Sequence, residues 1–227
     1  MMNRTFATLT IGQAPRPDIT PILDAHVPAH VKRVHRGLLD GLSRAEIDAR
    51  YRQEAGEPAL VTRLGDGSVV ELSARRVRDG VQTQLSALEA AGCDIILLLC
   101  TGKFDGLRCG RAWLLEPDLI IPPATAGLIG NRQLGIIVPL ASQMTSESGK
   151  WGALARPPIF AAANPYTDTP EALARAGASL RERRTDALLL DCIGFAEPHR
   201  RALAETTGLP VILSNALMAK VVGELLS

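Results

Sequence analysis

Short apolar runs recur along this chain, and most of them stop at a turn-forming residue. Runs of about four to seven apolar residues between turn signals are typical of strands buried on both faces of a parallel sheet. Two of the runs lead directly into a cysteine, Cys100 and Cys192. Strands are predicted over 5–11, 30–35, 94–99, 115–123, 133–139, 186–192 and 209–213, and within 157–166.

Amphipathic stretches separate the apolar runs. In 74–91, Val77, Val81, Leu85 and Leu88 recur at three- and four-residue steps, so they share one face of a helix. A serine before this stretch and a glycine after it are typical helix start and end signals. Helices are predicted from Pro17 onward and over 44–52, 74–91, 107–115, 124–130, 169–184, 196–207 and 216–226.

Residues 36–72 interrupt this alternation. Ser43 and Glu46 have the spacing of a capping box, which predicts the short helix that follows. Two strand-like segments, 59–64 and 68–72, flank a Gly-Asp-Gly loop and predict a β-hairpin. We interpret the whole segment as an insert on the main sheet.

From residue 74 to the end, strands and helices alternate, which indicates an α/β fold with parallel sheets and helices on both faces. A helix followed by an aspartate, an apolar run and a cysteine occurs at 74–100 and again at 170–192. This internal repeat suggests two similar α/β lobes.

Composition narrows the functional classes. The chain has 227 residues, 46% of them hydrophobic, and a formal net charge of +1, so no field of one sign favours nucleic acid or a membrane surface as partner. No apolar stretch is long enough to cross a membrane. The N-terminal sequence has no long apolar region of a signal peptide, so we expect a cytoplasmic protein. With only 4% aromatic residues, the chain suits a small polar ligand.

The four cysteines contain no C-x-x-C pair and no histidine at metal spacing, so neither a zinc site nor a redox dithiol is predicted. Cys100 and Cys192 follow predicted parallel strands, and ligands bind at the carboxyl ends of such strands. They are the candidate reactive thiols. Cys93 and Cys109 are interpreted as small buried hydrophobes, Cys109 together with Trp113 on the buried face of the helix at 107–115.

For several other polar residues the sequence allows both a functional and a structural interpretation. The Ser/Thr-rich loop 140–149 either offers hydroxyls and N–H groups to an anion or is a solvated connector. Asp191 is more readily explained as a helix cap or a sheet-buried carboxylate than as a catalytic group. His199 is either an acid–base group or, as we favour, a surface or capping residue. His26, His30 and His35 are expected at the surface.

Five short segments and the hairpin insert together carry a family resemblance. The segments are TIG at 10–12, GLLDGLS at 37–43, IIPP at 120–123, GIIVP at 135–139 and LDCIGF at 190–195. Over essentially its whole length the chain resembles the AroM family, which is similar to the aspartate/glutamate/hydantoin racemase superfamily.

The resemblance implies two flavodoxin-like lobes related by a pseudo-twofold axis, one formed by 1–132 with 208–227 and the other by 133–207. It implies that Cys100 and Cys192 flank the substrate carbon in a cleft between the lobes. Ile193 stands where the racemases often have threonine. Superfamily relatives are often dimers, so a homodimer is the implied oligomer.

Two thiols suit proton transfer at carbon without pyridoxal phosphate. One takes the proton as thiolate and the other donates one from the opposite face. A cysteine has a pKa of about 8.5, which a positive helix end lowers, and both cysteines are expected to precede helix starts. We expect no cofactor, no metal ion and a small carboxylate-bearing substrate. The loop after the first strand is not a dinucleotide fingerprint.

Backbone N–H groups and side chains near the strand ends are candidates to bind that carboxylate. They are Gly12, Gln13, Arg16, Thr101, Gly102, Ile193, Gly194, Ser214 and Asn215. Two other functions stay open. Cys192 alone could serve an isomerase or decarboxylase of small dicarboxylates, or the fold could bind a small carboxylate without catalysis.

Overall fold

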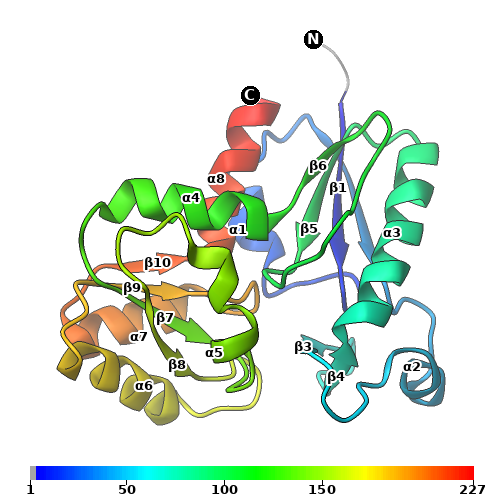
Figure 1. Ribbon diagram of the computed structural model, residues 1–227. Helices are drawn as coiled ribbons and strands as arrows, with labels where there is room; N and C mark the ends of the chain where they lie inside the picture. Colours follow the sequence, from blue (N-terminus) through cyan, green and yellow to red (C-terminus); the bar gives the residue numbers. More distant parts are fainter. Residues whose placement is uncertain (1–3) are drawn as a thin grey trace. The chain divides into compact units, whose positions relative to one another are not determined.

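The structure, a computed structural model, describes residues 4–227, which form two compact α/β units (Figure 1). One unit extends to Pro117 and includes Ala219–Ser227, and the other is Asp118–Met218. Each unit contains one four-stranded parallel sheet. The predicted α/β class with two parallel-sheet lobes is confirmed.

The sheet of the first unit has the strand order β2-β1-β5-β6. All five residues of β5 are buried, as expected for a strand covered on both faces. The elements of this unit are β1 (Thr5–Thr10), α1 (Thr20–Asp24), β2 (Lys32–Gly37), α2 (Arg44–Tyr51), β3 (Ala59–Arg63), β4 (Val69–Ser73), α3 (Ala74–Ala90), β5 (Ile95–Leu99) and β6 (Trp113–Leu115).

The sheet of the second unit has the order β10-β9-β7-β8, and its two central strands are entirely buried. Helices α6 and α7 lie side by side on one face of it (Figure 1). The elements are α4 (Pro117–Ile129), β7 (Leu134–Val138), α5 (Gln143–Ser146), the 3-10 helix η1 (Ser148–Trp151), β8 (Ile159–Ala162), α6 (Pro170–Glu182), β9 (Ala187–Leu190), α7 (Glu197–Thr207), β10 (Val211–Leu213) and α8 (Ser214–Leu226), which begins here and ends in the first unit.

The local signals of the insert and of α3 are confirmed. Strands β3 and β4 form the antiparallel hairpin. The Ser43 side chain accepts the N–H of Glu46, whose carboxylate accepts the N–H of Ser43, so the capping box closes the start of α2. The Ser73 side chain caps α3. Gly92, with φ of 84°, occupies the left-handed conformation that ends this helix.

The helix predicted at 107–115 is wrong. This stretch is irregular up to β6, where Trp113 is 63% exposed instead of buried. The carboxylate of Glu89 in α3 accepts the backbone N–H groups of Gly110, Arg111 and Ala112, which therefore do not need helical partners. These hydrogen bonds lower the pKa of Glu89. A contact from a distant helix thus decides the conformation here.

The strand predicted at 115–123 is also wrong, because these residues enter α4. Pro117 and Asp118 supply a proline at the start and an acid in the first turn, both of which favour a helix. The helix continues through Pro122 and Pro123 and includes most of the helix predicted at 124–130. A short apolar run fits a strand and a helix equally well by periodicity, which explains the error.

The lobe borders predicted near 132/133 and 207/208 differ from the borders of the two units. Strand β10 pairs in parallel with β9, which places it in the sheet of the second unit. Most of α4 also groups with this unit. The predicted loop 140–149 contains α5 and the start of η1.

Two helical glycines make a matched test of the packing between α6 and α7. A Cβ atom at Gly177 would lie 2.4 Å from Cδ2 of Leu203, which is fully buried, whereas a Cβ at Gly127 in α4 would meet no atom within 4 Å. We expect Gly177→Ala to lower the free energy of unfolding by roughly 1–3 kcal/mol through overpacking. Gly127→Ala should raise it by up to about 1 kcal/mol. Urea unfolding of both variants measures the difference, and equal effects would contradict this packing.

Candidate functional site

In each unit a cysteine lies just after a central strand, and the two cysteines have the same local hydrogen-bond geometry. Cys100 follows β5, and the N–H of Gly102 donates to its Sγ at 3.4 Å. Cys192 follows β9 by two residues, and the N–H of Gly194 donates to its Sγ, also at 3.4 Å. Both cysteines are buried. In both turns the glycine N–H is therefore directed at the sulfur of the cysteine two residues before it.

The two turns lead into different secondary structure. Helix α7 begins five residues after Cys192, whereas the chain from Cys100 to β6 contains no helix. The expectation that a helix start supports both thiols therefore fails for Cys100.

A tyrosine missed by sequence reasoning lies against the turn of Cys192. A Cβ atom at Gly194 would stand 2.2 Å from Oη of Tyr166, so only glycine allows this approach. The backbone of Tyr166 is held in place because its N–H donates to Oδ1 of Asn164, and the N–H of Asn164 donates to Oδ2 of Asp168. The sequence signal was the Asn-Pro-Tyr-Thr-Asp turn after β8.

The side chains of Ser214 and Asn215 support the backbone around Cys192. Ser214 donates its hydroxyl to the carbonyl of Leu190 at 2.7 Å. Asn215 donates its amide to the carbonyls of Ile193 and Phe195 at 2.9 and 2.5 Å. Both side-chain donors are thus used by the chain itself. They position the turn, and a role for these side chains in binding a carboxylate would require them to exchange partners.

A buried ion pair anchors the residue before Cys192. Nζ of Lys150 lies 2.7 Å from Oδ2 of Asp191 and 3.3 Å from Oε2 of Glu147, and the Lys150 side chain is only 5% exposed. Burial alone would lower the pKa of Lys150, but the two carboxylates outweigh it and hold the pKa above its usual value. Asp191 is therefore the sheet-buried carboxylate that was one of its two predicted structural roles.

Lys150 lies directly after the loop 140–149, for which a solvated connector was one of two alternatives, and most residues of that loop are exposed. The ammonium group of Lys150 lies 5.3 Å from the ring centroid of Trp151, which is itself buried, and its ion pair ties η1 to the end of β9. A single lysine at the end of a Ser-rich stretch gave no sequence signal for this role.

In the first unit, three predicted binding residues come together after β1. A Cβ at Gly12 would clash with Oγ1 of Thr62, so the glycine lets the loop pack on β3. Gln13 donates its amide to the carbonyls of Leu39 and Leu42 and accepts the N–H of Gly65. These contacts tie the loop after β1 to the insert.

Arg16 is buried and binds both Asp18 and Thr10. Its guanidinium donates to both carboxylate oxygens of Asp18, at 2.9 and 2.6 Å, and to Oγ1 of Thr10 at 3.2 Å. Burial alone would raise the pKa of Asp18, but Arg16 outweighs it and the pKa lies below the usual value. Arg16 and Arg63 line a small hollow of about 80 Å³. Arg63 was not among the predicted residues.

Of the remaining cysteines, Cys93 is buried as expected, whereas Cys109 is only half-buried and does not lie in a helix. Burial, reinforced by Glu89, raises the pKa of Cys109 to about 11, and burial also raises the pKa of Cys93. Such thiols are poor nucleophiles at neutral pH. His26, His30 and His35 are exposed.

His199 has the capping role that was favoured for it. The backbone N–H of Ala196 donates to its Nδ1 at 2.8 Å at the start of α7. Burial lowers the pKa of His199.

None of the helices within residues 4–227 is long and apolar enough to span a membrane. Within the same residues, no group of three or more His, Cys, Asp or Glu side chains is placed to hold a metal ion.

Comparisons with known proteins agree with this architecture. A family model described as AroM protein matches residues 6–226. No curated protein sequence matches the chain. The fold is similar to allantoin racemase from Klebsiella pneumoniae (TM-score 0.61, 14% identity, 97% of this chain and 87% of that one).

Two further solved structures share the fold. Glutamate racemase from Aquifex pyrophilus has a TM-score of 0.61 at 13% identity, covering 98% of this chain and 84% of that one. The maleate isomerase Iso from Pseudomonas putida S16 has a TM-score of 0.58 at 12% identity, covering 97% and 91%.

The clamp formed by Asn215 can be tested with a matched pair of substitutions. Asn215→Leu leaves two carbonyls without their donor, at a cost of about 1–3 kcal/mol for each buried group. The loosened turn should also let iodoacetamide alkylate Cys192 faster, while Cys100 keeps its rate. Asn131→Leu, at an exposed asparagine, should change neither stability nor alkylation. Unchanged Cys192 alkylation in Asn215→Leu would contradict the clamp.

His199 predicts a pH dependence of stability. Its folded-state pKa lies below the usual 6.5, so the unfolded chain binds the proton first as the pH falls. The contribution of His199 to stability is complete above about pH 6.5 and declines as the pH drops toward its folded pKa. His199→Gln keeps an acceptor for the Ala196 N–H, as in a capping box, but does not titrate. Urea midpoints between about pH 8 and pH 5 should fall more steeply for the natural protein than for this variant. If the urea midpoints of the two proteins fell in parallel with pH, His199 would not be the cause of the pH dependence.

Proposed function

The chain belongs to the AroM protein family, and on that premise we propose that it is a cofactor-independent isomerase acting at a carbon next to a carboxylate or a cyclic amide. The observation that carries the proposal is the repeated Cys-x-Gly turn, in which a thiol at a strand end accepts a glycine N–H. The fold is the one found in the allantoin and glutamate racemases and the maleate isomerase compared above, which supports this class of reaction.

In the proposed reaction, the thiolate of one cysteine takes the proton from the substrate carbon. The C–H electron pair passes into the neighbouring carbonyl group and forms an enolate. The thiol of the other cysteine then gives its proton to the opposite face, where the enolate pair makes the new C–H bond. The first cysteine ends as a thiol and the second as a thiolate, and no electrons are gained or lost.

Other residues have supporting roles in this proposal. Arg16 and Arg63 line a hollow with the carboxylate of Asp18, and their combined positive charge suits the carboxylate of a small substrate. Tyr166 is a further candidate, because its hydroxyl lies against Gly194 and a phenol can donate a hydrogen bond to a developing oxyanion. Preorganised donors of this kind are often worth a factor of about 10²–10³ in rate.

One observation favours a second candidate, in which Cys192 is the single reactive thiol. The turn of Cys192 is supported by Asn215, by Tyr166 and by the start of α7, whereas no helix follows Cys100 before β6. A single base could serve a decarboxylase or an isomerase that returns the proton to the same face.

The test is proton exchange at carbon in D₂O, followed by NMR, with allantoin, hydantoins, amino acids and small dicarboxylates as substrates. We expect one class to exchange its proton. Cys192→Ser should reduce this exchange by about 10²–10⁴-fold, the usual contribution of general acid–base catalysis. If both thiols act, Cys100→Ser should abolish inversion to a similar extent.

Cys93→Ser is the matched control, because Cys93 is also buried at the foot of β5 but has a raised pKa. It should exchange at the rate of the natural protein. Loss of exchange in Cys192→Ser alone would favour the single-thiol reaction. Absence of exchange in every substrate, with both thiols slow to alkylate, would overturn the enzyme proposal in favour of a carboxylate-binding protein.

A further inference from the structure

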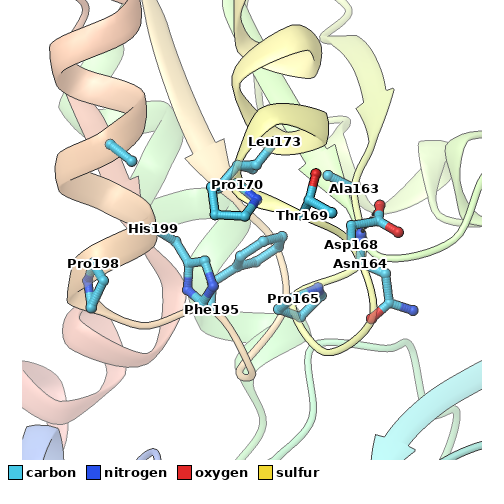
Figure 2. A pocket seen from close by; sticks show the side chains of 11 residues that line it. Ala163, Asn164, Pro165, Asp168, Thr169, Pro170, Leu173, Phe195, Pro198 and His199 are labelled. Carbon is cyan, nitrogen blue, oxygen red and sulfur yellow. Dashed lines mark hydrogen bonds between the residues drawn. The ribbon is translucent and has the colours of Figure 1, made fainter.

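The second unit contains a cavity of about 300 Å³ between the N-terminal ends of α6 and α7 (Figure 2). Its walls come from the loop that follows β8 and from the loop that follows β9. Figure 2 shows the Phe195 ring at its centre, with Pro165, Pro170 and Leu173 around it. Apolar walls around a concave space are the usual setting of a small-molecule site.

The polar groups of this cavity are few, and most are already used. Asn164 Oδ1, Asp168 Oδ2 and Thr169 Oγ1 each accept a backbone N–H from their own loop or helix. The side chain of His199 projects toward the same space from α7 and packs edge-on against Phe195, with ring centroids 5.4 Å apart (Figure 2).

The protonation of His199 follows from its hydrogen bond. Nδ1 accepts the N–H of Ala196 and therefore carries no hydrogen, so the proton of the neutral ring is on Nε2. The bond to Ala196 is the one hydrogen bond of this ring within residues 4–227. Nε2–H is thus a hydrogen-bond donor available to a ligand.

The charged residues around the cavity indicate which kind of ligand could accept a hydrogen bond from Nε2–H of His199. The described residues that line it include no lysine or arginine, whereas the carboxylate of Asp168 lies on one side. A carboxylate ligand would find no cationic side chain here and would be repelled by Asp168, and Thr169 and His199 already accept N–H groups at the two helix starts. An uncharged acceptor, such as an amide or ketone carbonyl, avoids this cost.

We propose that this cavity binds an uncharged, ring-containing small molecule whose carbonyl oxygen accepts a hydrogen bond from Nε2–H of His199. The volume corresponds to about ten non-hydrogen atoms, because one water takes up about 30 Å³ of liquid. The ring would lie against Phe195 and the prolines. The residues that line this cavity include neither Cys100, Cys192 nor Arg16, so the site is separate from the groups of the proposed reaction, although a cyclic amide would fit both.

The cavity is connected to the turn of Cys192 through Phe195. The N–H of Phe195 donates to the carbonyl of Cys192 at 3.2 Å, and the carbonyl of Phe195 accepts from Asn215. A ligand that packs on the Phe195 ring therefore contacts the residue at which the Cys192 turn ends.

The test compares benzamide with benzoate, which has nearly the same size and shape but carries a charge, and with ethylbenzene, which has no acceptor. Binding is followed by ¹H–¹⁵N NMR titration of the full chain. We expect benzamide to shift signals of 163–173 and 195–202 saturably and to bind at least about tenfold more tightly than benzoate. His199→Phe should weaken benzamide about tenfold, the worth of one hydrogen bond, and leave ethylbenzene unaffected.

A steric pair of variants on α7 serves as the control. Ala202→Trp fills the cavity and should abolish benzamide binding, whereas Glu205→Trp puts the same side chain on an exposed position of the same helix and should not. Equal binding to these two variants, equal affinity for benzamide and benzoate, or no saturable shifts at all would each overturn the proposal. None of these outcomes depends on proton exchange at Cys192, so failure of the proposed function would be recognised separately.

Discussion

The hydrogen bond from a glycine N–H to the sulfur two residues before it is the interaction on which the candidate chemistry depends. It occurs once after β5 and once after β9, at 3.4 Å in each case. Both strands are buried along their whole length, so they leave no place for polar groups except at their ends. The Cys-x-Gly turn places a thiol there and keeps a donor directed at it. The glycine is needed because Leu60 in one unit and Tyr166 in the other occupy the space of a side chain.

In the second unit, several side chains support the turn of Cys192, and each binds a different group of it. Asn215 holds the carbonyls of Ile193 and Phe195, and Ser214 holds that of Leu190. Lys150 compensates the carboxylate of Asp191, which would otherwise be a buried charge beside the thiol. The start of α8 and the segment α5–η1 therefore act as supports for the end of β9. Removing one support leaves a buried polar group without its partner, which costs more than the net worth of the bond.

Phe195 links the two candidate sites of the second unit. Its backbone belongs to the turn of Cys192, and its ring forms the centre of the cavity beside His199 (Figure 2). The two sites differ in chemistry. The turn is polar and holds a candidate acid–base thiol, whereas the cavity is apolar with one donor. A carboxylate has a counter-charge near Arg16 in the first unit and none in this cavity.

The sequence by itself determined the parts of this protein that depend on local patterns. The buried strands, the capping box of Ser43 and Glu46, the helix after Ser73 and the positions of both thiols at strand ends were all predictable, because periodicity and capping act over a few residues. Tertiary structure decided the rest. Glu89 holds 110–112 out of a helix, pairing with β9 assigns β10 to the second sheet, and Lys150 reaches Asp191 across 41 positions. Each of these contacts joins groups far apart in the chain, and a local pattern carries no record of its distant partner.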